Sequence, residues 1–232
     1  AQTLQSATLG FETFAFDASP RNFAEMEKAH DKISDASVKS RIRLYQNAVS
    51  STVGTTVKFS SIGGTGDHVG GETIDAGNEK YVKAGEDGIV EVPTITLDHV
   101  IENDVPNKSI YMVKIDTQGH EMEVFSGFWR SVSKGLVRYI LFEYWVDAMD
   151  EAAGVPFGSC EGVQILEKLK DFGYEVFDLS VLAHPKAPKE RKAKWKSKFF
   201  RPLSFNDNCK YFSNMGQEDR DVEIDGQGYG MG

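Results

Sequence analysis

Apolar residues recur along the chain with two different spacings, which predict alternating strands and helices. Nearly continuous apolar runs such as residues 110–116 are typical of strands buried on both faces. Apolar residues about one helical turn apart, as in residues 162–174, predict amphipathic helices, and Gly173 ends this one. The predicted strands are residues 11–17, 41–50, 55–62, 110–116, 136–145, 174–182 and 208–214; the predicted helices are 22–30, 121–129 and 162–174; and residues 90–101 run from a strand into a helix that starts at Thr96 or Asp98.

Strands that alternate with helices at this spacing indicate βαβ units. Such units build a mainly parallel sheet with helices on both faces, so the expected fold class is α/β. The length of 232 residues suits one substantial domain, placed here at residues 1–215. The acidic, glycine-rich residues 216–232 predict a disordered tail. Residues 63–88 are rich in Gly, Asp, Glu and Lys and predict a long surface loop.

Composition and charge exclude some classes of protein. The chain has 26 Lys and Arg against 35 Asp and Glu, a formal net charge of −9, which argues against a dedicated nucleic-acid-binding protein. No apolar stretch approaches the ~18 residues that a membrane span needs. The compartment stays open, with the cytoplasm as the default expectation, and so does the oligomeric state. Cys160 and Cys209 lack the spacing of metal ligands and are expected to be incidental thiols.

The candidates for a ligand site are the residues that follow each predicted strand, because open α/β sheets bind ligands outside the carboxyl ends of their strands. Asp17 follows the first strand, and an acidic side chain at this place can accept both hydroxyls of a ribose. The alternative interpretation is that Asp17 forms a turn or lies at a helix N-terminus. Asn47 is a further candidate, and it belongs to the second predicted strand.

The segment KIDTQGHE, residues 114–121, is the densest in candidate chemistry. Lys114 and Asp116 belong to an otherwise apolar strand, where a buried charge is costly unless it is paired or faces a site. One interpretation is therefore a structural Lys–Asp pair, with Glu121 as a capping residue of the following helix.

The other interpretation of this segment is a functional site. Gly119 permits a sharp turn that leaves Gln118 and His120 near the open end of the strand. A histidine among carboxylates can be tuned as a general base near neutral pH. Glu143, at the end of the next strand, adds a second carboxylate at the same edge and favours this interpretation.

Two other segments carry weaker signals. The glycine cluster GGTGDHVGG, residues 63–71, fails the G-x-G-x-x-G spacing, so a lid or substrate loop is expected there rather than a phosphate-binding loop. The basic residues 185–200 are either a solvated helix face or a contact for phosphate-bearing molecules. The H-E-x-x-H, G-x-S-x-G and P-loop motifs are absent from the sequence.

Taken in order, these segments resemble the FkbM-type family of S-adenosylmethionine-dependent methyltransferases. The resemblance covers about residues 11–182, and its most specific part is the pair VPTITLD and KIDTQGHEMEVFSG, which Gly127 closes. FDASPRN (16–22), QNAVSS (46–51) and LFEYW (141–145) carry the remainder. The family pattern usually has Glu-Pro where this chain has Asp17 and Ala18, and we take the substituted acid to preserve a ribose contact.

The resemblance implies a Rossmann-like class I methyltransferase sheet, mostly parallel with helices on both faces. Residues 1–10 look like the end of the helix that follows the glycine-rich cofactor turn in this class, so the chain is expected to lack the first strand of the domain and its cofactor loop. The cofactor implied is S-adenosylmethionine. Asp17 would hold the ribose, Asn47 would lie near the adenine, and Asp116 and Gln118 would lie at the mouth of the cofactor site.

The reaction implied is O-methylation of a hydroxyl on a sugar or small natural product. The base would be His120, which we prefer for its pKa, or else Asp116 or Glu143. No metal is required, although Asp116 and Glu143 could hold one. The whole interpretation expects Asp17 and residues 116–121 to share a cleft at one rim of the sheet.

Two alternatives remain open. One is a methyltransferase-like binding module that is not catalytic and has lost cofactor binding. The other is an NAD-dependent enzyme on a related sheet, which Asp17 alone would permit but in which the KIDTQG segment would have no role.

Overall fold

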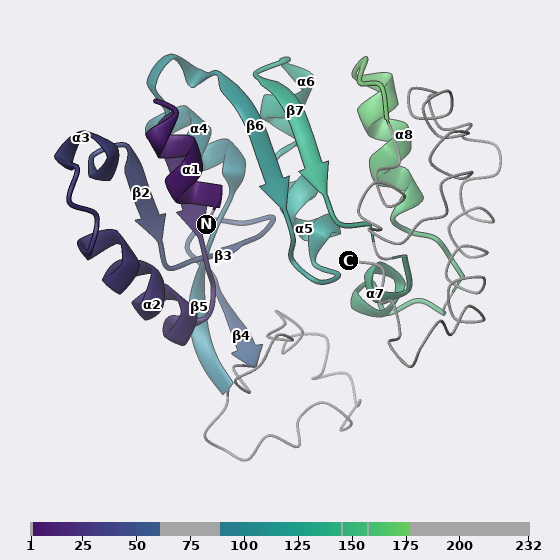
Figure 1. Ribbon diagram of the computed structural model, residues 1–232. Coiled ribbons are helices and arrows are strands. Elements are labelled where there is room, and N and C mark those ends of the chain that lie inside the picture. Colours follow the sequence, from purple (N-terminus) through teal and green to yellow (C-terminus); the bar gives the residue numbers. More distant parts are fainter. Residues whose placement is uncertain (1, 61–88, 145, 157, 177–232) are drawn as a thin grey trace, which may run out of the picture. The chain divides into compact units, whose positions relative to one another are not determined.

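The computed structural model describes residues 2–60, 89–144, 146–156 and 158–176, and these form a mixed α/β structure (Figure 1). They fall into two compact units, one made of the residues up to Ser109 with Glu123–Ser131, the other of Ile110–Met122 and the residues from Val132 on. The elements are α1 (Gln2–Thr8), β1 (Thr13–Phe16), α2 (Pro20–Asp31), α3 (Ala36–Lys39), β2 (Ile42–Tyr45), β3 (Ala48–Val49), β4 (Thr56–Ser60), β5 (Ile89–Ile95), α4 (Leu97–Asn103), the 3₁₀ turn η2 (Pro106–Lys108), β6 (Ile110–Ile115), α5 (Glu121–Ser126), α6 (Trp129–Ser133), β7 (Val137–Phe142), α7 (Val146–Ala152) and α8 (Val163–Asp171).

Strand pairing among these elements is mostly parallel. β1 pairs with β2, β3 with β5 and β6 with β7 in parallel, whereas β4 runs antiparallel to β5. The expected α/β class and mainly parallel pairing are therefore confirmed. The described strands form three small sheets, of two, three and two strands.

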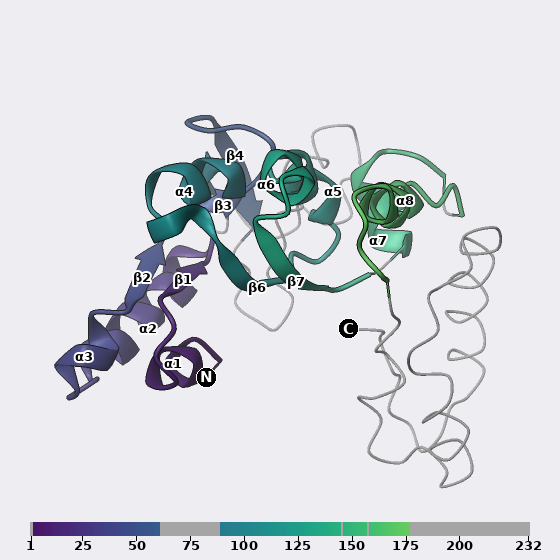
Figure 2. The same ribbon diagram turned by 90° about the horizontal axis from the view of Figure 1, so that it is seen from above.

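In the first unit, one face of the β1–β2 pair packs on helices. Val38 and Ile42 are buried together with Ala7 of α1, and Ile33 and Leu44 pack against them. Figure 2 shows α1 beside this strand pair. The small Ala7 side chain allows α1 to lie close to the apolar residues of β2, and burial of these aliphatic groups is what holds the helix there.

The other face of the same strand pair carries stacked aromatic rings. The rings of Phe16 and Tyr45 lie 4.7 Å apart between centroids, and those of Phe14 and Tyr45 lie 6.4 Å apart. The hydroxyl of Tyr45 donates to a carboxylate oxygen of Asp104 at 3.0 Å. Burial, with the Asp104 carboxylate beside it, raises the pKa of Tyr45 to about 12, so this phenol stays a donor at physiological pH.

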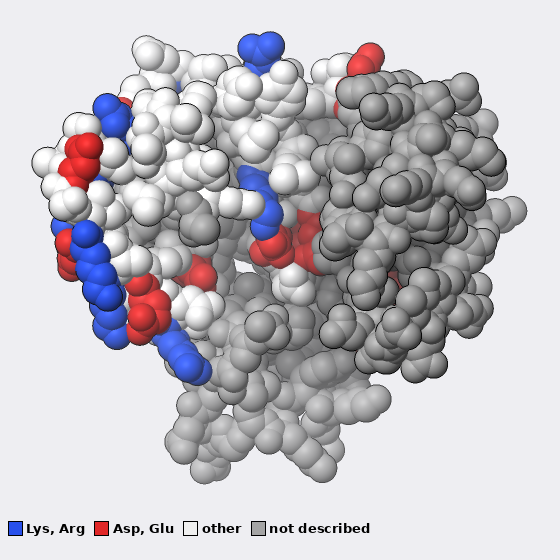
Figure 3. All heavy atoms as spheres, in the orientation of Figure 1, with Lys and Arg blue, Asp and Glu red and all other residues white. Residues whose placement is uncertain are grey.

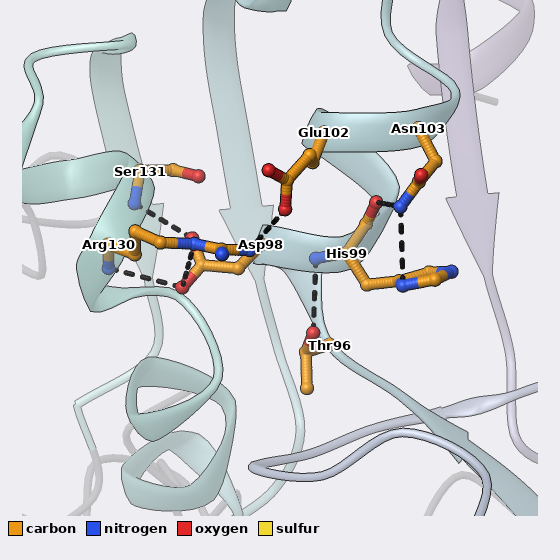
Figure 4. Close-up of polar contacts among 7 residues, drawn as sticks. All are labelled: Thr96, Asp98, His99, Glu102, Asn103, Arg130 and Ser131. Carbon is orange, nitrogen blue, oxygen red and sulfur yellow. Dashed lines mark hydrogen bonds and ion pairs between the residues drawn. The ribbon is translucent and has the colours of Figure 1, made fainter.

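The start of α4 is tied to the start of α6 by short polar side chains (Figure 4). Thr96 is the N-cap of α4, because its hydroxyl accepts from the backbone N–H of His99 at 3.1 Å. Asp98 bonds outside its own helix, accepting from the backbone N–H groups of Arg130 at 3.1 Å and Ser131 at 2.7 Å. Of the two start signals expected, Thr96 is the cap, and Asp98 joins α4 to α6.

In the second unit, α7 and α8 enclose a small core. Val146, Cys160 and Leu166 are buried there, with Phe142 and Val163 among the residues packed against them. Helix α8 ends as expected, since Gly173 has φ +87° and the N–H of the next residue reaches back to the carbonyl of Leu169. Cys160 is disulfide-bonded, so the expectation of an incidental thiol is wrong at this position.

The expectation that β6 and β7 are buried on both faces is wrong. Ile115 and Val137 are buried, but Met112 and its register partner Tyr139 are 54% and 45% exposed. Apolar runs of this kind are typical of central strands in a sheet covered on both faces. In the described residues β6 and β7 pair with each other, and the face carrying Met112 and Tyr139 stays open to solvent.

Two predicted elements are broken in the structure. The strand expected over residues 41–50 is split, because β2 pairs with β1 whereas β3 pairs with β5. The helix expected over residues 121–129 is split into α5 and α6 at Gly127. The predictions for residues 63–88, 185–200, 208–214 and 216–232 lie outside the described residues, as does most of the strand expected at 174–182.

Gly127 is required by close packing. A Cβ placed there would lie 2.2 Å from the carbonyl oxygen of Ser50 and 3.0 Å from side-chain atoms of Thr96. The carbonyl of Gly127 also accepts from the N–H of Asp98 at 3.0 Å, so this backbone cannot withdraw without losing that bond. The break between α5 and α6 therefore follows from the tight contact at this glycine.

Gly127→Ala should lower the free energy of unfolding by about 1–3 kcal/mol or more, because the new methyl group meets backbone that cannot move. Denaturant titration followed by circular dichroism measures this. Ser126→Ala, at the exposed last residue of α5 directly before Gly127, is the matched control and should change stability by less than about 0.5 kcal/mol. Equal stability of the two variants would contradict the packing described at Gly127.

Candidate functional site

Asp116 and Glu143 lie at the carboxyl ends of two parallel neighbours. The register of β6 and β7 pairs Ile115 with Phe142, the last residue of each strand. The backbone N–H of Glu143 donates to the carbonyl of Ile115 at 3.1 Å, which continues the pairing by one step. The next side chains, those of Asp116 and Glu143, are therefore brought to the same edge, as the sequence predicts.

Gln118 bridges these two carboxylates. Its side-chain Nε2 donates to Oδ1 of Asp116 at 2.9 Å and to Oε2 of Glu143 at 2.6 Å. Lys114 forms an ion pair with the other oxygen of Asp116. The Lys–Asp pair considered from the sequence is thus present, together with the second carboxylate that favours a site. In Figure 3 basic and acidic side chains meet at the surface near the ends of β6 and β7.

The pKa values of the two carboxyl groups in this pair are shifted in opposite directions. The hydrogen bond from Lys114 holds the pKa of Asp116 below its usual range. Burial, with the nearby Asp116 carboxylate, raises the pKa of Glu143 from 4.5 to about 7. Two like charges this close cannot both form easily, so near neutral pH Asp116 is ionised and Glu143 exchanges a proton. A carboxylate tuned to this range is suited to general acid–base work.

A tight turn connects β6 to α5 and carries Gln118. Gln118 has φ +55°, a left-handed conformation that costs a non-glycine residue about 1–2 kcal/mol. Gly119 has φ +103°, and a Cβ there would lie 2.9 Å from the Cβ and the carbonyl oxygen of Ala148 in α7. The sharp turn expected at Gly119 is confirmed, and the lack of room beside α7 is a second reason for glycine.

Glu121 holds this turn from the inside. It has no exposed surface, and its carboxylate accepts from the N–H of Thr117, the hydroxyl of Thr117 and the N–H of Gly119, each at 2.9 Å. These donors belong to the turn before α5 and not to the helix, so the capping role considered from the sequence stays a prediction. The burial and the number of bonds exceed what the sequence indicates, because Glu at a helix start is usually solvated.

Asp17 forms a turn at the end of β1, in the first unit. Its Oδ1 accepts from the backbone N–H of Ser19 at 2.9 Å, and Ser19 is the N-cap of α2. The turn-forming interpretation of Asp17 is confirmed. Its side chain is partly exposed, and the ribose contact stays a prediction.

Asn47 and His120 are the remaining candidates. Asn47 lies between β2 and β3, and its side-chain amide donates to the carbonyl of Pro93 at 3.1 Å, which ties this connection to β5. His120 ends the turn before α5; its backbone N–H donates to the carbonyl of Thr117 at 3.3 Å. The adenine contact of Asn47 and the base role of His120 stay predictions.

One buried carboxylate was missed from the sequence. Asp150 of α7 has no exposed surface and accepts from the backbone N–H groups of Gly158, Cys160 and Glu161 at 2.9–3.0 Å. Its surroundings in the sequence are those of an exposed acidic helix, so no signal marked it. It organises the loop before α8.

Two further properties concern the described part of the chain. No group of three or more His, Cys, Asp or Glu side chains in it is arranged to hold a metal ion. Nor does any of its helices have the length and apolar character that crossing a bilayer requires.

Polar side chains at the carboxyl ends of parallel strands are typical of ligand-binding α/β proteins. The sequence model of one such family, described as Methyltransferase FkbM domain, matches residues 6–176. The chain therefore belongs to the FkbM methyltransferase family, and the resemblance noted in the sequence is confirmed. No curated protein and no solved structure matches it.

In the wild-type chain the Glu143 carboxyl should titrate with a midpoint near 7, measured by its ¹³C chemical shift in NMR. Asp116→Asn removes the neighbouring negative charge and should lower this midpoint by about one unit or more. Asp171→Asn, at the exposed end of α8, is the control and should leave it unchanged. A wild-type midpoint near the ordinary 4.5 would contradict the pairing of the two carboxyl groups.

Proposed function

We propose that this chain is an S-adenosylmethionine-dependent O-methyltransferase acting on a hydroxyl of a sugar or small natural product. The proposal rests on the family match and on one observation in particular. At the carboxyl ends of two parallel strands, Glu143 has its pKa raised to about 7 beside an ionised Asp116. A methyl transfer to a hydroxyl needs such a base.

The Asp116–Glu143 pair supplies the proton acceptor in this proposal. When bound, the cofactor would supply an activated methyl group on its sulfonium. The acceptor hydroxyl would lose its proton as its oxygen bonds to that methyl carbon and the methyl–sulfur bond breaks. Glu143 takes this proton in its ionised form. Lys114 keeps Asp116 ionised, and Gln118 holds the two carboxyl groups together. His120 is favoured by the ordinary pKa of histidine, whereas burial and the neighbouring Asp116 carboxylate raise the pKa of Glu143 to about 7, and we propose Glu143 as the base.

Some of the described side chains fit parts of the cofactor, namely its ribose and its adenine. Asp17 is a partly exposed carboxylate at the end of β1, which is the group that accepts a ribose diol. The bond from the Asn47 side chain to the carbonyl of Pro93 fixes the connection between β2 and β3. We propose that Asn47 contacts the adenine. Asp116 and Gln118 are proposed as further cofactor contacts. A Rossmann-like class I methyltransferase sheet belongs to the same proposal.

The direct test is binding and turnover on the same preparation. Calorimetry with S-adenosylmethionine measures binding, and transfer of a labelled methyl group to a panel of sugars and hydroxylated small molecules measures activity. Binding with transfer to oxygen supports the proposal. If neither binding nor transfer is detected, in this chain and in an N-terminally extended one, the non-catalytic binding module is favoured.

Asp17→Ala should weaken S-adenosylmethionine binding by about 1–3 kcal/mol, because the charged partner of the ribose hydroxyls is lost. Asp17→Asn separates this role from the turn, since the amide oxygen can still accept from Ser19. If Asp17 holds the ribose, calorimetry will show weaker binding in both variants. Weaker binding in the alanine variant alone would leave Asp17 a turn former.

Glu143→Gln should lower kcat about 100-fold or more while cofactor binding is retained, because the proton acceptor is removed. In the wild type, kcat/KM should rise with pH through about 7, since Glu143 must be ionised to accept the proton. His120→Gln is the matched comparison. A 100-fold loss in that variant, with Glu143→Gln still active, would assign the base to His120.

A further inference from the structure

Glu121 is a buried carboxylate with no place in the proton transfer proposed above. All three of its described partners belong to the turn between β6 and α5: the N–H and hydroxyl of Thr117 and the N–H of Gly119. A carboxylate is costly to bury, and it is retained here by three hydrogen bonds. The turn that it holds contains Gln118.

Gln118 cannot reach both carboxylates from an arbitrary backbone. Its φ of +55° is unfavourable for a side chain with a Cβ, so the turn needs support from outside the residue. The bonds of Glu121 fall on the residues immediately before and after Gln118. Its backbone is thus fixed at both sides, and its Nε2 is presented to Asp116 and Glu143.

We propose that Glu121 is a positioning residue for the Asp116–Glu143 pair, which it acts on through the turn that carries Gln118. This inference rests on the proposed function for its catalytic meaning, but the geometry it concerns exists without a substrate. The buried carboxylate keeps the bridging amide in place, and the bridging amide keeps the two carboxyl groups close enough to share a proton.

The chemistry of the partners explains why this residue is a carboxylate. Each of the three groups that face it donates a hydrogen bond, and an ionised carboxylate is acceptor-only. A glutamine would turn its N–H₂ toward at least one backbone N–H. An aspartate keeps the charge but is one methylene shorter, so from the same backbone it cannot reach both Thr117 and Gly119. Glu121→Gln removes the charge at the same side-chain length, whereas Glu121→Asp shortens the side chain at the same charge, so the two variants distinguish the effect of length from that of charge.

The separation matters because Glu121 also acts on Glu143 through its charge. The charged groups acting on Glu143 are Asp116, Glu121 and Lys114, of which the two carboxylates raise its pKa and the lysine lowers it. Loss of the Glu121 charge alone would therefore lower the pKa of Glu143 without any movement of the turn. Glu121→Asp retains that charge.

The experiment follows the Glu143 midpoint by ¹³C NMR in the chain without ligand. If Glu121 acts by position, Glu121→Asp should lower this midpoint by about one unit or more, as Glu121→Gln should. Glu123→Gln removes the same charge from an exposed position of α5 and should leave it unchanged. A lowered midpoint in Glu121→Gln but an unchanged one in Glu121→Asp would reduce the role of Glu121 to its charge and overturn the proposal.

Gln118→Ala provides a second route, because it removes the bridge at a partly exposed side chain and leaves the turn's own bonds intact. It should change the Glu143 midpoint by itself, since it removes both the amide donor to that carboxylate and the link to Asp116. Adding Glu121→Asp to Gln118→Ala should then produce little further shift, since both act on one contact. Additive shifts would show that Glu121 does not act through Gln118.

These titrations also keep the two proposals apart. A chain that shows the expected midpoints but transfers no methyl group would contradict the proposed function and leave the positioning role intact. A chain that transfers methyl groups, but whose Glu121→Asp variant keeps the wild-type Glu143 midpoint, would support the proposed function and contradict the positioning role.

Discussion

The candidate site depends on the parallel pairing of β6 with β7. Parallel neighbours end at the same edge, so a register that pairs Ile115 with Phe142 also places the side chains that follow, Asp116 and Glu143, together. A shift of one residue would turn each side chain to the opposite face and separate the carboxyl groups. The raised pKa of Glu143 is a consequence of this register, because both the burial and the neighbouring charge come with it.

The two most specific segments of the family resemblance contain residues of two kinds, some in the scaffold and some in the candidate site. In VPTITLD, Thr96 caps α4 and Asp98 binds the start of α6, while Gly127 at the end of the second segment packs against Ser50. These residues maintain a junction between helices. In KIDTQGHE, by contrast, polar side chains gather around Asp116. A motif match therefore identifies the family, but geometry is needed to divide its residues between scaffold and site.

The sequence predicted the parts of this fold that follow from local residue patterns, and from the rule that parallel neighbouring strands end at the same edge of a sheet. Turns and caps at Thr96, Gly119 and Gly173 follow from local chemistry, and they are as expected. The exposed face at Met112 and Tyr139 could not be predicted, because an apolar run does not show which neighbours a strand will have. The buried hydrogen bonds of Asp150 and Glu121 could not be predicted from the sequence either, because they include backbone N–H donors, which any sequence supplies.

Lys114 determines which carboxyl group of the pair takes the proton. Two adjacent carboxyl groups with equal surroundings would share a proton without preference. Here the ammonium group contacts an oxygen of Asp116, and the hydrogen bond it donates favours the ionised form of that residue. The proton is consequently left to Glu143, where burial also favours the neutral form. The asymmetry that a directional proton transfer requires is thus built from one lysine two residues before Asp116, and from the unequal burial of two otherwise similar groups.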